Sequence, residues 1–384
     1  MRKLNKVSIV QRHRHILFWS GTFWPKIGGV EVLAARLLPA LKERGYEFTV
    51  VTSQIYLDGP PVEEYQGIPV HRLPLSGGSV NVGRLAELRR QLRTLWREVA
   101  PDLVHANTVN AMDYFLLTNR GAHPAPLLVS LHGKWPDRED PIVRQTLAAA
   151  NWVTGCSRAI LEKGRWLVPE IDSRSSVIYN GVDVPSLPPE PLPWAPPHLL
   201  YVGRLAHEKG VDLALEALAH ITSRHPHVRL TVAGDGQERA GLEALATDLG
   251  LAHMVDFAGW VDPKTVPALM NGATLVLVPS RNEALGLVAL QSAMMGRPVV
   301  GMAVGGLPEV VVHGETGLLV QAGDSRALGE AIVTLLENPQ QAAEMGKNAR
   351  RRAPEVFGWE RYVDAHDALY QRLVEVGQKD RRTP

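Results

Sequence analysis

Short runs rich in β-branched and aromatic residues alternate with segments of helical period along the chain, and this alternation restricts the fold more than any other feature. Strands that alternate with helices pair in parallel, because each crossover helix returns the chain to the same end of the sheet. Strands are expected at 15–20, 47–53, 102–107, 126–133 and 176–181, and again at 198–204, 228–234, 254–260, 274–280 and 297–302. The pattern therefore predicts an α/β protein with two doubly wound domains.

A proline-rich segment separates the two sets of strands. Seven prolines lie between residues 185 and 197, and proline neither donates to a strand ladder nor continues a helix. Pro354 and Gly358 interrupt the helical pattern again near the end of the chain. We predict a first domain over 1–184, a linker over 185–197, a second domain over 198–357, and a last helix within 358–384 that can pack back on the first domain.

Length and charge narrow the class of partner. The 384 residues suffice for two α/β domains of ordinary size. With 41 Lys and Arg against 40 Asp and Glu, the formal charge of +1 gives no reason to expect a nucleic acid. The single Cys156, the lack of a leader-like segment and the lack of a membrane-spanning apolar run indicate a cytoplasmic protein. Any membrane contact would then be peripheral, at the inner face.

Ligands of doubly wound sheets sit beyond the carboxyl ends of the strands, so two facing domains form an interdomain cleft. After the first strand, Gly28 and Gly29 precede a helix. Adjacent glycines let the backbone approach an anion, and a helix start points N–H groups at it. A tight strand-to-helix turn accounts for a bare glycine pair equally well, and the full dinucleotide fingerprint is missing.

The second domain repeats this arrangement with cations added. Gly203 and Arg204 follow a strand, and Lys209 precedes Gly210 and the next helix. A guanidinium fork and a lysine suit the two phosphates of a nucleoside diphosphate, although loop cations are more often merely solvated. His132 directly follows an apolar strand of the first domain, where a cleft residue is expected, although a lone histidine more often has a packing role.

The segment 280–296 carries a loop carboxylate, Glu283, and a carboxamide, Gln291, eight residues later in a predicted helix. Two polar groups around an apolar stretch suggest a bound ligand. The sequence contains no Asp-x-Asp, Cys-x-x-Cys or His-Glu-x-x-His motif, so no metal site is predicted. Arg204, Lys209 and helix N-termini are then left to neutralise a diphosphate.

A series of segments in a fixed order carries a family resemblance. They are "GGVEVLAARLLPALKERG", "PDLVHAN", "SLHG", "VIYNGVD", "VGRLAHEKG", "VAGDGQER", "FAGWVD", "PSRNEALGLVALQSAMMGRPVV" and "GGLPEVV". Over roughly residues 14 to 365 the chain resembles the retaining glycosyltransferases of family 4, the glycogen-synthase-like group. The resemblance implies the GT-B fold, in which two Rossmann-like domains face a cleft that holds a nucleotide sugar.

The resemblance also implies roles for particular residues. His132 would lie beside the donor sugar, Arg204 and Lys209 would hold the diphosphate, and Glu283 would contact sugar hydroxyls. The remaining donor-binding positions would be Gly28, Gly29, Gly203, Gly234, Gly259, Leu285, Gly286, Leu287 and Gln291. The implied reaction is metal-independent transfer with retention, without a cofactor, in which the leaving phosphate acts as base on the same face of the sugar. A UDP-sugar is the favoured donor.

Gln291 departs from the family pattern. The second glutamate of the family's E-x7-E motif binds the ribose hydroxyls, and here that position is a carboxamide. A neutral hydrogen bond contributes about 0.5 to 1.5 kcal/mol, compared with about 1.5 to 3 kcal/mol for a charged one. We expect weaker or altered nucleotide binding rather than loss of the chemistry.

The acceptor stays open between a saccharide, a lipid and a small molecule. The segment 82–100 predicts a basic helix whose leucines lie on one side, which suits either an anionic membrane or, more commonly, packing on the protein's own sheet. Three other functions stay open as well: a UDP-sugar 2-epimerase or another GT-B activity, a noncatalytic sugar-nucleotide sensor, and a nicotinamide dehydrogenase, which the missing fingerprint disfavours.

Overall fold

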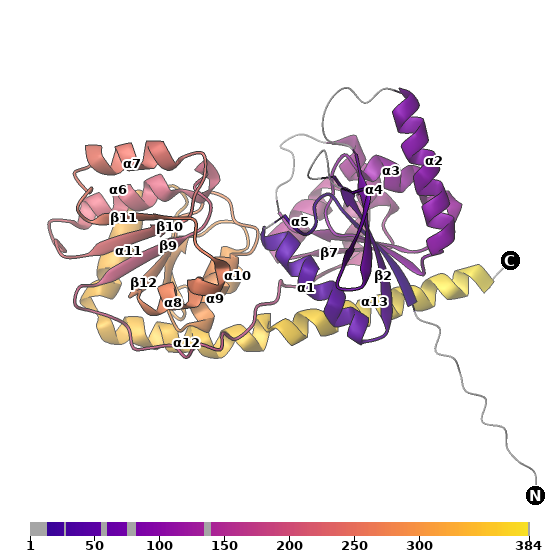
Figure 1. Cartoon of the computed structure of the whole chain (residues 1–384). Helices are drawn as coiled ribbons and strands as arrows, with labels where there is room; N and C mark the ends of the chain where they lie inside the picture. Colours follow the sequence, from indigo (N-terminus) through magenta and orange to yellow (C-terminus); the bar gives the residue numbers. More distant parts are fainter. Residues whose placement is uncertain (1–13, 27, 55–59, 75–81, 134–139, 383–384) are drawn as a thin grey trace, which may run out of the picture.

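The computed structural model describes residues 14–382 except 27, 55–59, 75–81 and 134–139. Two α/β lobes lie side by side, and a long helical segment near the C-terminus runs along both of them (Figure 1). Each lobe contains one sheet with helices packed on its faces, and the fold of each is therefore the doubly wound arrangement expected from the alternating pattern.

The first sheet, within the described residues, has eight strands in the order β3-β4-β2-β1-β5-β6-β7-β8. The strands are β1 (Arg14–Ser20), β2 (Tyr46–Ser53), β3 (Val62–Tyr65), β4 (Ile68–Leu73), β5 (Leu103–Ala106), β6 (Leu127–Leu131), β7 (Trp152–Gly155) and β8 (Ser175–Val177). The helices of this lobe are α1 (Gly29–Glu43), α2 (Val82–Val99), α3 (Asp113–Asn119), α4 (Pro141–Ala149) and α5 (Arg158–Leu167). Strand β1 lies between two parallel partners, with Ile16 opposite both Phe48 and Leu103. Such strands are covered on both faces, which explains their nearly continuous apolar sequence.

The second sheet, again within the described residues, has the order β11-β10-β9-β12-β13-β14 and pairs in parallel throughout. Its strands are β9 (His198–Val202), β10 (Arg229–Ala233), β11 (Val255–Gly259), β12 (Leu275–Val278), β13 (Val299–Met302) and β14 (Gly317–Val320). Its helices are α6 (Val211–Ile221), α7 (Arg239–Asp248), α8 (Val266–Asn271), α9 (Leu287–Met294), α10 (Leu307–Val310) and α11 (Ser325–Glu337).

Four strands, β3, β4, β7 and β14, were not expected from the sequence, and one pair is not parallel. Strands β3 and β4 form an antiparallel hairpin around Gln66 and Gly67, whose φ angles are 50° and 72°. Positive φ at both central residues is the geometry of a tight hairpin turn. The expected strand at 176–181 is short, since β8 ends at Val177. Strands β3, β7, β8 and β14 have only three or four residues, which leave too little periodic signal to be recognised in the sequence, and the six-residue β4 contains Pro69, which disfavours a strand.

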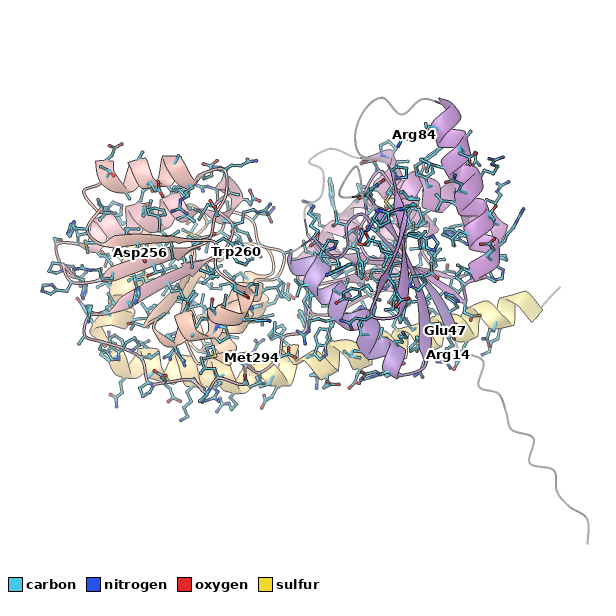
Figure 2. The ribbon with its side chains drawn as sticks, in the orientation of Figure 1. Arg14, Glu47, Arg84, Asp256, Trp260 and Met294 are labelled. Carbon is cyan, nitrogen blue, oxygen red and sulfur yellow. The ribbon has the colours of Figure 1, made fainter. Side chains whose placement is uncertain are left out.

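The chain passes between the lobes at two places that are hydrogen-bonded to each other. The Val182 N–H donates to the Phe357 carbonyl at 2.9 Å, and the Trp359 N–H donates to the Val182 carbonyl at 3.0 Å. Helix α12 (Pro339–Phe357) packs on the second lobe, where its Ala349 and Ala353 share a buried apolar cluster with Met294 of α9. Met294 is labelled beside this helix in Figure 2. Helix α13 (Trp359–Arg382) continues along the first lobe (Figure 1) and contributes buried Tyr362, Val363 and Tyr370 to its core.

The proline-rich linker is attached to the second lobe. The guanidinium of Arg297, which is only 1% exposed, donates to the Glu190 carbonyl at 2.7 Å and to the Asn271 side-chain oxygen at 2.9 Å. The Asn271 amide nitrogen in turn donates to the Pro188 carbonyl at 2.9 Å. The linker is therefore held on the second lobe, and the chain changes lobes at the paired crossing of Val182 and Gly358.

Candidate functional site

A cleft of about 570 Å³ lies between the two lobes, at the carboxyl ends of strands from both sheets. The β1–α1 loop and the end of β6 form its first-lobe wall, and the segments after β9 and β12 form its second-lobe wall. The lining includes nine of the residues that the sequence singled out: Gly28, Gly29, His132, Arg204, Lys209, Glu283, Leu285, Gly286 and Leu287. These positions come from distant parts of the chain, and the two-lobe fold brings them together.

Four other predicted residues lie outside this lining. Gly203, Gly234 and Gly259 stand at the ends of the neighbouring strands β9, β10 and β11. Gly234 has a φ of 157°, and a Cβ there would collide with the Gly203 carbonyl oxygen, so the two loops can approach each other only at a glycine. Gln291 is partly buried on α9, four residues after Leu287 and therefore on the same helix face.

The glycine pair of the first lobe allows close approach of the second lobe. A Cβ on Gly29 would lie 3.0 Å from the Leu287 methyl group, so the start of α1 and the start of α9 approach each other across the cleft. Gly28 caps α1 in extended conformation, and Glu31 in the first turn accepts a 2.5 Å hydrogen bond from Thr22. The pair is therefore more than a local turn, because a side chain at position 29 would press on the Leu287 side chain of the other lobe.

On the second-lobe wall, both lysine and arginine side chains of the described lining, Lys209 and Arg204, are paired with carboxylates. Lys209 Nζ lies 2.7 Å from Glu283 Oε2, and the Ser280 hydroxyl donates to the same oxygen at 3.2 Å. Arg204, with 65% of its side chain exposed, lies 3.3 Å from Glu208. The Arg281 N–H donates to the Glu208 carbonyl at 2.9 Å, which holds the Glu283 loop beside the Lys209 segment. A bound anion would share these cations with the carboxylates.

Helix α9 begins directly at the cleft. Gly286 has a φ of 103° and precedes the first helical residue, so the loop turns sharply from Glu283 into the helix. Residues 285 to 288 line the cleft. The first N–H groups of a helix lack partners within the helix and carry partial positive charge, so this helix start favours an anion.

His132 follows β6 and offers an uncharged ring to the cleft. Burial lowers its pKa to about 4, and nearby His366 contributes in the same direction, so the imidazole is neutral at pH 7. Its Nε2 lies 3.2 Å from the Asn107 side-chain oxygen. Its buried Nδ1 and the side-chain oxygen of Asn180 have no hydrogen-bond partner within the described residues, and both residues line the cleft. The two side chains also act on each other, because Asn180 raises the pKa of His132 against the effect of burial, so a polar ligand would compete with this contact.

Several residues that line the cleft have no role predicted from the sequence. Asn180 is the most informative of them, because its side chain is 4% exposed and lies beside His132. It is part of the quoted "VIYNGVD" segment, so its position in the family pattern was the available signal. Lys26 and Glu31 flank the glycine pair. An exposed lysine and a helical glutamate carry no signal of their own in a single sequence.

The basic helix, α2, occupies the flank of the first lobe that faces away from the second lobe (Figure 1), with Arg84 near its start (Figure 2). Its apolar residues Leu88, Leu92 and Trp96 are buried in the lobe's own core. No helix among the described residues combines the length and hydropathy needed to cross a bilayer. Any contact of α2 with an anionic surface would therefore depend on its exposed arginines rather than on an apolar face.

Two doubly wound domains that enclose a polar cleft between their strand ends define the GT-B class of enzymes. Residues 27–186 match the family described as Glycosyltransferase Family 4, and residues 188–352 match Glycosyl transferases group 1. Glycogen synthase of Mycobacterium tuberculosis is 32% identical over 307 residues, which cover 72% of this chain and 69% of that protein. The chain therefore belongs to the glycogen-synthase-like glycosyltransferases of family 4.

Solved structures support the same assignment. Sucrose-phosphate synthase from Thermosynechococcus elongatus superimposes with a TM-score of 0.80 at 24% identity, covering 94% of this chain and all of that one, which shows the shared fold. Anabaena HepE, solved in complex with UDP, gives a TM-score of 0.78 at 25% identity over the same shares of the two chains. The predictions of the GT-B fold and of a glycosyltransferase are confirmed. The dehydrogenase and noncatalytic alternatives lose their support.

Proposed function

We propose that this glycosyltransferase takes its sugar from a UDP-sugar and transfers it to a hydroxyl group with retention at the anomeric carbon, without a metal ion. The observation that carries the proposal is the convergence of Arg204, Lys209 and the start of α9 on one wall of the cleft, opposite Gly29 and His132. Two cations and a helix N-terminus are a suitable environment for a diphosphate. The similarity to HepE, which was solved with UDP, supports uridine as the base.

Charge compensation of the leaving diphosphate is the main catalytic contribution in this proposal. As the bond to the anomeric carbon breaks, negative charge grows on the diphosphate, and preorganised positive groups stabilise it. Arg204 and Lys209 would supply full charges, and the N–H groups at Leu287 and Val288 would supply the partial charge of α9. Within the described residues, no group of three or more His, Cys, Asp and Glu side chains is arranged to hold a metal ion.

Retention through a same-face attack fits the state of the cleft carboxylates. Within the described lining, Glu31 is hydrogen-bonded to Thr22, Glu208 is paired with Arg204, and Glu283 is paired with Lys209. A carboxylate engaged by a cation is a weaker nucleophile than a free one. The leaving phosphate oxygen is therefore the favoured base for the acceptor hydroxyl. The neutral imidazole of His132 and the carboxylate of Glu283 would hold the donor sugar.

Thermal unfolding in the presence of UDP, GDP, ADP and their sugars tests the donor, because a ligand that binds only the native state raises the melting temperature. UDP and one UDP-sugar should give the largest shifts. Products formed from that donor with saccharide, lipid and small-molecule acceptors are then analysed for anomeric configuration by NMR. An inverted product would reject the same-face mechanism, and epimerised free UDP-sugar without transfer would indicate a UDP-sugar 2-epimerase.

Activity should survive removal of divalent metal ions. Because side-chain cations neutralise the diphosphate in this proposal, excess EDTA should leave the rate of UDP release within about twofold of the untreated enzyme. The comparison is made by dialysis against EDTA followed by assay with and without added Mg²⁺ or Mn²⁺. Loss of activity that either ion restores would show that the cleft needs a metal.

Gln291→Glu should tighten binding of free UDP. A charged acceptor stabilises a ribose hydroxyl by about 1 kcal/mol more than a carboxamide does, which corresponds to up to about tenfold in affinity. The ribose is remote from the reacting carbon, so KM should fall while kcat changes little. Calorimetry with UDP on the parent and the variant measures the effect. An unchanged Kd would remove the ribose role from Gln291.

A further inference from the structure

A carboxylate from the second lobe caps a helix of the first lobe. Glu309 lies on the short helix α10, and its Oε2 accepts from the Arg158 N–H at 2.9 Å while its Oε1 accepts from the Ala159 N–H at 3.1 Å. Arg158 and Ala159 are the first two residues of α5 in the other lobe. One side chain therefore makes two hydrogen bonds across the domain boundary.

This contact completes the hydrogen bonding at the start of α5. The first N–H groups of a helix have no partner inside the helix. The third of them, from Ile160, donates to the hydroxyl of Ser157 at 3.1 Å, so Glu309 supplies the partners for the other two. A negative carboxylate is also favourable at the positive end of the helix dipole. The first-lobe helix is therefore fully capped only when the second lobe is in place.

The same contact holds the loop that presents Glu283. The Ser157 hydroxyl donates to the Ala284 carbonyl at 2.6 Å, and the Gly306 N–H donates to the Glu283 carbonyl at 2.9 Å. A Cβ on Gly306 would collide with the Ala284 carbonyl oxygen and with the Ser157 side chain. The start of α5, the turn before α10 and the peptide next to Glu283 are therefore packed without space between them.

Further hydrogen bonds fix Glu309 on its own side. Arg352 on α12 donates to the Glu309 carbonyl at 3.0 Å and to the Val310 carbonyl at 3.1 Å. The Tyr179 hydroxyl, from the first lobe, donates to Glu309 Oε2 at 2.9 Å. Burial and the Glu309 carboxylate raise the pKa of Tyr179, which keeps this donor protonated. Helix α12 ends at the paired crossing, so Glu309 is connected to the place where the chain changes lobes.

We propose that Glu309 and Ser157 form an interdomain pivot that positions Glu283 relative to His132 and Gly29. In the cleft lining, Gly29 and Leu287 approach through nonpolar atoms, whereas the pivot consists of directional hydrogen bonds. The lobes can then separate between Gly29 and Leu287 while this contact persists. Glu309 and Ser157 are positioning residues, because they act on the reaction through the peptide at Ala284. The catalytic part of the inference rests on the glycosyltransferase activity, and the geometric part does not depend on the donor.

Distances between spin labels test the geometric part directly. Labels are placed at Arg93→Cys on α2 and Arg326→Cys on α11, which are exposed positions in different lobes, while the natural Cys156 is buried. Glu309→Ala should broaden the distance distribution clearly, and Glu309→Gln, which keeps the side-chain volume and one acceptor oxygen, should give an intermediate width. Asp324→Ala is the matched control, because Asp324 caps α11 inside the second lobe through the Ala327 N–H at 2.8 Å. Its distribution should equal that of the parent.

Kinetics on the same variants test the catalytic part. Glu309→Ala and Ser157→Ala should each lower kcat about tenfold, because a small displacement of a catalytic group has a large effect on rate. The Kd for UDP should stay within about twofold of the parent value, because most of its expected contacts lie in the second lobe. Glu309→Gln should recover part of the loss, and Asp324→Ala should retain parental turnover.

The outcomes separate the pivot from the proposed donor. A parental distance distribution in folded Glu309→Ala would overturn the pivot, and so would a kcat unchanged from that of the parent. An equal loss in Asp324→Ala would mean that any lost helix cap has this effect, which would also overturn it. If UDP does not bind the parent, the donor proposal fails, and the distance measurements still decide whether the pivot exists.

Discussion

Lys209→Ala is expected to lower turnover with the UDP-sugar about 10²- to 10³-fold, the scale for removing one group that stabilises developing charge. Two consequences add together at this position. The growing charge on the diphosphate loses a cation, and Glu283 loses the ammonium that lies 2.7 Å from its carboxylate. With only 14% of its side chain exposed, Glu283 is poorly solvated by water once it is unpaired. Its position against the donor sugar should therefore be disturbed as well.

Arg204→Ala distinguishes the loss of charge at the diphosphate from the disturbance of Glu283. Its guanidinium is exposed and pairs with Glu208 rather than with Glu283, so its removal should affect the diphosphate alone. Initial rates of UDP release, measured on variants whose circular dichroism and melting temperature match the parent, give both effects. Lys347→Ala is the control, because Lys347 is a 74% exposed cation paired with Glu344 on the distant helix α12. Near-parental turnover in folded Lys209→Ala and Arg204→Ala would refute the phosphate assignment.

Glu283→Gln is expected to reduce kcat by about 10²-fold while leaving the Kd for free UDP nearly unchanged. The amide has almost the same shape, so the loop and its hydrogen bond to Gly306 should persist. What changes is charge. The carboxylate balances Lys209 and would face a sugar that becomes positively charged as its bond breaks, and a neutral amide stabilises that state less.

Comparison with Gln291→Glu shows whether the effect of Glu283→Gln is specific to the sugar rather than to the nucleotide. The two variants exchange the same functional groups at positions eight residues apart, in opposite directions. Calorimetry with UDP should respond to position 291, and single-turnover rates with the UDP-sugar should respond to position 283. Normal turnover in Glu283→Gln would show that this carboxylate does not support the reacting sugar, and a large loss of UDP affinity would place it against the nucleotide instead.

Local sequence patterns were sufficient to predict most of the fold. The long central strands and crossover helices were predictable because both faces of a parallel sheet are buried, which leaves apolar runs such as that of β1 between helical periods. The four-residue strands β3 and β14 were not predictable, since strands of this length are defined by their neighbours rather than by their own residues, and Pro69 masks the strand character of β4.

Only part of the candidate site could be predicted from local sequence patterns. Glycines and cations next to strand ends marked Gly29, Arg204 and Lys209, because parallel strands bring their carboxyl ends to one edge. The ion pair of Lys209 with Glu283 joins residues 74 positions apart. The family resemblance had assigned these two residues to different parts of the donor, the diphosphate and the sugar. Asn180 was overlooked because a buried carboxamide is recognised only by what surrounds it.

The sequence by itself determined the two-domain α/β architecture and the chemical character of the cleft walls, because both follow from periodicity and from residue types at strand ends. Only the tertiary structure decided how the walls face each other. In the sequence, Glu309 is a glutamate of the quoted "GGLPEVV" segment and Ser157 is an ordinary helix cap, and nothing local indicates a partner in the other lobe. Their hydrogen bonds to Arg158 and Ala284 span more than a hundred residues. Directional contacts between separately folded lobes depend on the docked geometry, which no local pattern encodes.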